Sequence, residues 1–296
     1  MVSIRGFHRF SKNLALFALL VSFAAPATAQ VSNLTVTGTS KPCSATGNMI
    51  DFTNGYSSCT ATATKWETKI YEMGVCSAHP FGTAKTGVSL DASKCEVFYA
   101  ENVPSNIDIA KLIGTSSNLS GTSTLPPEGK YSHVYVAFGS VFTSAGDFTH
   151  NGTKYYNIVN GDAGTSGAAV DHVTAYKNFG APGSCVSGYV GGQTSGGEEM
   201  DIFLTNVQNE RSPTNGDLDG SNNCAKNNKI IVVVKAATPA VITPKTYSIK
   251  FNFKLTGGGV SFSDDDCPVN GGGGCDGVPE DFGLGAIDAE FIVIGN

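Results

Sequence analysis

The sequence has little charge and no long basic segment. Only 15% of its 296 residues are charged, and the formal net charge is −6. Without a run of Lys or Arg, the counterion release that drives most nucleic-acid binding has no source. The hydrophobic fraction of 41% excludes a disordered chain, and the 36 glycines lack the period of collagen. We therefore expect a folded protein that does not bind nucleic acid.

The sequence also lacks the local motifs of common catalytic and metal sites. It contains no H-E-x-x-H zinc motif, no nucleophile elbow, no phosphate-binding glycine loop and no C-x-x-C pair. The adjacent Glu198 and Glu199 would point to opposite faces of a strand, so this spacing does not make them a facing acid and base. The sequence thus favours a non-enzymatic role and identifies no catalytic residue.

Two short segments resemble parts of known families. Gly6-Phe7 resembles the processing site of type IV pilins, but Ser11 stands where that family has Glu. The segment 164–168 resembles the nucleophile segment of subtilisin-like proteases, but Val170 stands where that family has Pro, and matching Asp and His motifs are missing. We interpret the first as part of a secretory leader and the second as a glycine-serine loop.

The N-terminus has the three parts of a cleavable signal peptide. Basic residues come first, then an apolar run, then small residues: Arg5, Arg9 and Lys12, then Leu14–Ala25, then Pro26 and Ala27-Thr28-Ala29. As a helix this run would be ~18 Å long, too short for the ~30 Å core of a bilayer. We therefore assign residues 1–29 to a signal peptide and expect a secreted or cell-surface protein without a permanent membrane span.

Eight cysteines in an exported chain predict disulfides. Short loops close at the least entropic cost, which favours sequential partners. The expected pairs are Cys43–Cys59, Cys76–Cys95, Cys185–Cys224 and Cys267–Cys275.

Hydrophobic alternation with a period of two predicts antiparallel strands. It is clearest over Tyr247–Leu255, and strands are also expected at Lys65–Met73, Cys95–Ala100, Tyr131–Phe138, Met200–Val207, Ile230–Lys235 and Ile287–Ile294. The single helical signal is short: Ser105 or Asn106 would cap a segment containing Ile109, Leu112 and Ile113.

The pattern therefore predicts an all-β, disulfide-stapled antiparallel β-sandwich with very little helix, either one large sandwich or two smaller ones. A β-rich part would span residues 30–125 and a β-sandwich part residues 126–296. The stretch Gly114–Gly129 would be a linker, or a long loop if both parts form one domain.

One polar loop has the spacing of a calcium site. Asn215, Asp217 and Asp219 alternate before Gly220, and Asn223 could add an oxygen ligand. Lys226 at the twelfth position excludes a standard EF-hand, and the alternative is a polar turn near Cys224. A second acidic loop combines Asp264, Asp265 and Asp266 with Asp276, Glu280 and Asp281, where solvent exposure relieves the repulsion most simply.

These features favour an exported structural or adhesive surface protein that associates with itself or with other surface components. Residues 31–39 read as a strand, with Leu34 and Val36 on one face, and such a strand could join a neighbouring subunit in a filament. The alternative is a secreted hydrolase or calcium-dependent carbohydrate-binding module. Exposed aromatics would support carbohydrate binding, but the only Trp, Trp66, falls on the core face of its strand.

Cleavage after Ala29 predicts that the exported protein begins at Gln30. Terminal sequencing of protein from the producing cells checks this. Recovery of Met1 on the exported chain would show that the leader is retained.

Overall fold

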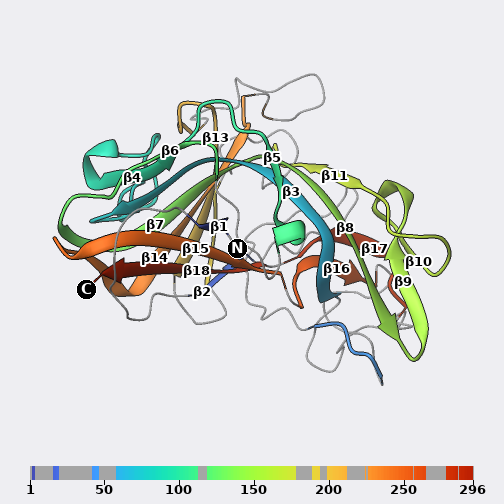
Figure 1. Ribbon diagram of the computed structural model, residues 1–296. Helices are drawn as coiled ribbons and strands as arrows, with labels where there is room; N and C mark the ends of the chain where they lie inside the picture. Colours follow the sequence, from blue (N-terminus) through green and yellow to red (C-terminus); the bar gives the residue numbers. More distant parts are fainter. Residues whose placement is uncertain are drawn as a thin grey trace.

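The computed structural model describes residues 2–3, 16–19, 42–46, 58–112, 119–177, 189–193, 199–211, 224, 226–255, 257–264, 278–285 and 287–295 (Figure 1). In these ranges the only helices are single 3-10 turns: η2 (Ala92–Lys94), η3 (Ile109–Leu112) and η4 (Val159–Gly161). The remaining regular structure is antiparallel β-sheet, which confirms the all-β prediction. No helix within these ranges is long and apolar enough to span a membrane.

Fourteen strands form one large curled sheet. In chain order they are β3 (Ser58–Cys76), β4 (Cys95–Ala100), β5 (Asn106–Asp108), β6 (Thr122–Ser123), β7 (Gly129–Gly139), β8 (Val141–His150), β9 (Thr153–Asn157), β10 (Ala163–Gly164), β11 (His172–Ala175), β12 (Tyr189–Gln193), β13 (Glu199–Thr205), β14 (Lys229–Ile242), β16 (Gly259–Ser263) and β17 (Asp281–Leu284). The main path runs β10-β9-β8-β3-β7-β14-β13-β12.

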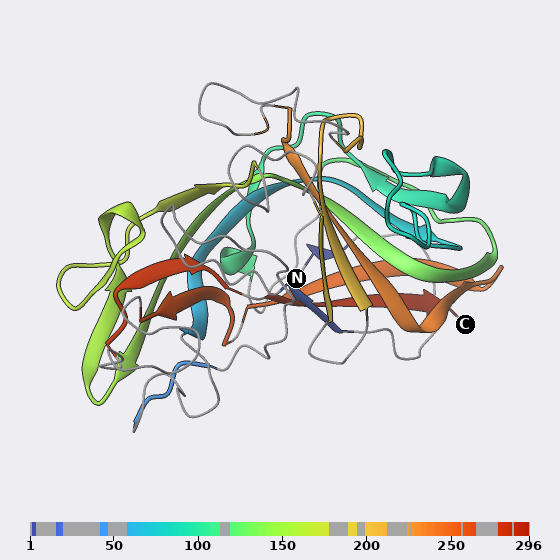
Figure 2. The same ribbon diagram turned by 180° about the vertical axis from the view of Figure 1, so that it is seen from behind.

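The long strand β3 joins the two ends of this sheet. Its first half pairs with β8 and β16, and its second half pairs with β4 and β7. The register shifts between Ala63 and Lys65 against β8 and between Ile70 and Glu72 against β7. Such bulges bend a strand and increase its twist. The curl of β3 across the molecule is visible in Figures 1 and 2.

The main core lies on the concave side of the curled sheet. Trp66 has no exposed surface and Ile70 is 1% exposed, as the alternation in this segment predicts. The indole packs edge-on against Phe138 and Phe142, with ring centroids 6.2 Å and 5.1 Å away. Trp66 is therefore a core residue and is not available to stack on a sugar.

A small second sheet faces part of this core. Its order is β1 (Val2–Ser3), β15 (Thr246–Lys254), β18 (Ile287–Gly295) and β2 (Leu16–Leu19). Phe253 of β15 lies 6.0 Å from Phe138, and Phe291 of β18 lies 5.6 Å from Phe98, measured between ring centroids. The described chain thus has one large curled sheet with a smaller layer against it. All seven segments expected to be strands coincide with strands, but β15 ends before Leu255 and β13 ends before Asn206 and Val207.

The predicted helical segment begins later than the sequence pattern suggested. Asn106–Asp108 form β5, which pairs with Glu67–Lys69 of β3, so Ser105 and Asn106 are not caps. The carboxylate of Asp108 instead accepts from the backbone N–H of Ala110, 3.2 Å away, at the start of η3. Pairing with β3 outweighs the weak local preference for a helix.

Gly74 of β3 lies opposite Tyr135 of β7, and a Cβ atom on Gly74 would overlap the Tyr135 ring. We expect Gly74→Ala to lower the free energy of unfolding by about 1–3 kcal/mol, the usual cost of overpacking. Chemical denaturation measures this. Gly129→Ala is the control, because its Cβ would meet Tyr131 at an ordinary 3.5 Å. Equal stability of the two variants would contradict the close approach.

Candidate functional site

Two disulfides staple the described chain. Cys43–Cys59 and Cys76–Cys95 have S–S distances of 2.05 Å and 2.10 Å, and they are sequential pairs of the kind expected from loop length. Cys224 is also disulfide-bonded, to a partner that is not among the described residues. The expected partners Cys185, Cys267 and Cys275 lie outside the described ranges. Disulfides point to an oxidising compartment.

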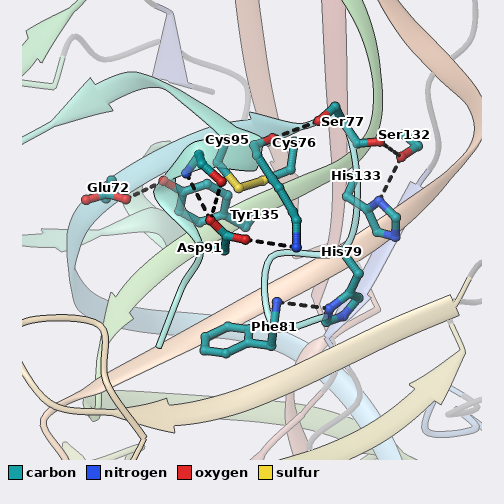
Figure 3. The surroundings of a disulfide bond; sticks show 12 residues. Glu72, Cys76, Ser77, His79, Phe81, Asp91, Cys95, Ser132, His133 and Tyr135 are labelled. Carbon is teal, nitrogen blue, oxygen red and sulfur yellow. Dashed lines mark hydrogen bonds and ion pairs between the residues drawn. A yellow bond between two sulfur atoms is a disulfide. The ribbon is translucent and has the colours of Figure 1, made fainter. Parts of the chain in front are cut away.

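The Cys76–Cys95 bond closes a loop that packs on the face of the sheet opposite the main core. Figure 3 shows this disulfide together with His79 and Phe81 of the loop. Phe81 of this loop stacks on Phe203 of β13 with ring centroids 4.0 Å apart. These rings join a second core cluster that includes Tyr135 and Ala137 of β7 and Val233 of β14. The centre of the sheet is therefore buried on both faces.

Beside this second core, the loop places a histidine against a buried carboxylate. His79 Nδ1 accepts the backbone N–H of Phe81 at 3.1 Å, and His79 Nε2 lies 3.1 Å from Asp201 Oδ2. Because Nδ1 is an acceptor, the ring proton is on Nε2 and is donated to Asp201. Asp201 is only 1% exposed. Both ring nitrogens of His79 are occupied, so this pair fastens the loop to β13.

A lysine of the same loop completes the contact. Lys85 Nζ lies 3.0 Å from Asp201 Oδ1 and also binds Glu199, whose second oxygen is 3.6 Å from Lys235 Nζ. The hydrogen bond from Lys85 holds the pKa of Glu199 below its usual range. Glu199 therefore pairs with lysines at the half-exposed end of β13, and Glu198 lies outside the described ranges.

His133 lies on the other side of His79, with its ring edge-on and the centroids 5.4 Å apart. Burial, followed by the charge of His79, lowers the pKa of His133 to about 4. Ser132 Oγ donates to the carbonyl of Ser77 at 2.9 Å and lies 2.9 Å from His133 Nδ1. In this arrangement the hydroxyl proton is directed to the carbonyl, so His133 does not activate Ser132 as a nucleophile.

Five residues make up this contact between the loop and the sheet, which we call the charge clamp: His79, Lys85, His133, Glu199 and Asp201. No local sequence motif could have revealed this cluster. His79 and Asp201 are 122 residues apart in sequence. Only the Cys76–Cys95 spacing indicated that this loop is held close to the sheet. Both ring nitrogens of His79 are hydrogen-bonded, and the lowered pKa of His133 keeps that ring neutral near pH 7.

The residues proposed for calcium lie elsewhere in the chain. Asn215, Asp217, Asp219 and Asn223 are outside the described ranges, so the calcium site stays a sequence prediction. Within the described ranges, no group of three or more His, Cys, Asp or Glu residues is placed to hold a metal ion. Of the second acidic loop, Asp264, Glu280 and Asp281 are described, and Asp264 is buried at the end of β16.

The segment 164–168, which resembles part of the subtilisin-like proteases, forms the end of a short strand and an exposed bend. Gly164 ends the two-residue strand β10, and residues 165–168 are exposed in the bend that follows. This agrees with a glycine-serine loop.

No protein-family model, curated protein or solved structure matches this chain. Its function must therefore be argued from its own residues.

The low pKa of His133 predicts a pH-dependent stability. A histidine whose pKa is about 4 in the folded state and about 6.5 in the unfolded state binds its proton more readily when unfolded. The free energy of unfolding therefore falls as the pH drops from 6.5 to 4. We expect His133→Gln to remove about 2 kcal/mol of this fall, after allowance for solvent screening. Denaturation between pH 4 and 7.5 measures it, and parallel profiles for the two proteins would contradict it.

Proposed function

We propose that this protein is an exported structural or adhesive surface protein whose subunits assemble into filaments by strand addition. One observation carries the proposal: both outer edges of the paired strands β15 and β18 are occupied by residues of the predicted leader (Figure 1). Val2 and Ser3 pair with β15, and Leu16–Leu19 pair with Ile287–Glu290 of β18.

Cleavage after Ala29 would remove both of these neighbours. The two edges would then expose a row of unpaired backbone N–H and C=O groups, which favours pairing with another strand. Edge strands that resist such pairing often carry Lys or Pro, and β18 contains neither. Its second half is instead the uncharged, β-rich run Phe291-Ile292-Val293-Ile294.

The β15–β18 pair is well placed to act as an acceptor. Phe253 and Phe291 pack on Phe138 and Phe98 of the large sheet, so the pair has an anchor that does not depend on the leader strands. Ile249 and Leu255 of the same segment are also buried. A fixed edge lowers the entropic cost of binding a partner strand.

The donor would be the strand predicted at residues 31–39, from a second copy of the chain. Donor and acceptor are different patches, so the contact is head-to-tail and produces open filaments. Backbone hydrogen bonds would supply affinity, and the alternate side chains Leu34 and Val36 would supply specificity.

Electron microscopy of the mature protein tests the proposal. Filaments are expected from the chain that begins at Gln30, and a cooperatively folding monomer is expected after deletion of residues 30–39. An excess of a peptide of residues 30–39 should shorten the filaments of the intact chain, because it occupies the acceptor edge.

A pair of matched variants separates strand recognition from simple loss of sequence. Leu34→Ser with Val36→Ser changes the proposed inward face and should abolish filaments. Thr35→Ser with Thr37→Ser changes the opposite face and should leave them intact. A mature protein that stays monomeric at high concentration, with no filaments on the producing cells, would refute the proposal.

A further inference from the structure

The start of β14 buries a lysine against the side-chain amide of an asparagine. Lys229 is only 6% exposed, and its Nζ lies 3.0 Å from Asn209 Oδ1 and 2.7 Å from the carbonyl oxygen of Val207. The same Nζ lies over the ring of Tyr71, 4.9 Å from its centroid. The buried amine therefore lies against two carbonyl oxygens and an aromatic ring, and the nearer atom of Asn209, Oδ1, is bonded to the carbon that Nζ would attack.

The backbone around Asn209 is fixed before any reaction. Asn206 Oδ1 accepts the backbone N–H groups of Gln208 and Glu210, both at 2.9 Å. The carbonyl of Asn209 accepts from Leu90 of the disulfide-closed loop at 3.1 Å, and its own N–H donates to Asn206 at 3.1 Å. Positioning of this kind favours reaction between neighbouring groups.

The surroundings also favour the neutral amine, which is the nucleophilic form. Burial lowers the pKa of Lys229, and the one charge that opposes this effect is that of Glu72. Glu72 accepts a hydrogen bond from the Tyr135 hydroxyl (Figure 3). Lys85 differs, because its amine faces two carboxylates, Asp201 and Glu199, which stabilise the ammonium form.

We propose that Lys229 and Asn209 form an intramolecular isopeptide bond. Nζ of Lys229 attacks Cγ of Asn209, the Cγ–Nδ2 bond breaks, and Nδ2 leaves as ammonia after gaining the proton that Nζ loses. No oxidant or cofactor is required, and the product is an amide between the two side chains.

This bond would fasten the connection between β13 and β14. The connection also contains Cys224 and the predicted calcium loop. The cross-link would therefore join the two ends of this connection covalently. Because β14 pairs with both β13 and β7, the bond would resist separation of strands in the centre of the sheet. The inference is independent of strand addition and goes beyond the proposed function.

Peptide mapping by mass spectrometry tests the cross-link in the purified, reduced mature protein. We expect a branched peptide that joins the segments containing Asn209 and Lys229, lighter than their sum by one ammonia. Trypsin should not cleave after Lys229. The branched peptide is required because cyclisation of Gln30, or of Asn151 before Gly152, would also remove one ammonia from the intact mass.

Three variants complete the test. Lys229→Arg should abolish the branched peptide, whereas Lys245→Arg at an exposed position should retain it. Asn209→Gly should fold, because glycine tolerates the positive φ of 62° at this position, and it should lose the cross-link. Branched peptide at the wild-type level in Asn209→Gly would overturn the assignment of Asn209 as the reacting amide. Linear peptides cleaved after Lys229 in the folded wild-type protein would overturn the cross-link itself.

Discussion

The pairing of β3 is the constraint on which the described structure depends. This one strand of 19 residues shares its two edges among β4, β5, β7, β8 and β16, so strands from distant parts of the chain are arranged around it. Its register shifts bend it, and the bend turns a flat array into a curled sheet that encloses Trp66. The residues at 58–112 and those beyond 129 therefore pair directly in one sheet.

On the face of the sheet opposite the main core, a few of the charged groups of this low-charge protein hold the disulfide-closed loop in place. The disulfide loop brings Phe81 onto Phe203, and a hydrogen bond from His79 and an ion pair of Lys85, both with Asp201, hold that loop in place. A buried carboxylate without such partners would be costly, so the clamp and the second core depend on each other. The arrangement makes the centre of the sheet rigid on both faces.

A rigid sheet and an open sheet edge would both serve the proposed role as a filament subunit. Such a subunit would need strands that do not separate under force and an edge on which a neighbouring subunit can pair. The disulfide-closed loops, the clamp at Asp201 and the proposed amide at Lys229 would meet the first need, and the edges of the paired strands β15 and β18 would meet the second. None of these features requires a substrate-binding cleft.

The local sequence pattern was sufficient to predict the strands, because side chains on a pleated sheet alternate between its two faces. The hydrophobic residues of Tyr247–Leu255 and of Lys65–Met73 follow this two-residue repeat. The local pattern also indicated the Cys43–Cys59 and Cys76–Cys95 pairs, since short loops close most readily. It failed at Asn106–Asp108, where pairing with β3 replaced a helix cap. The contacts of His79 with Asp201 and of Lys229 with Asn209 have no local signature. They arise only when chain folding brings separate strands and loops within hydrogen-bonding distance, because a hydrogen bond depends on separation in space and not on separation along the sequence.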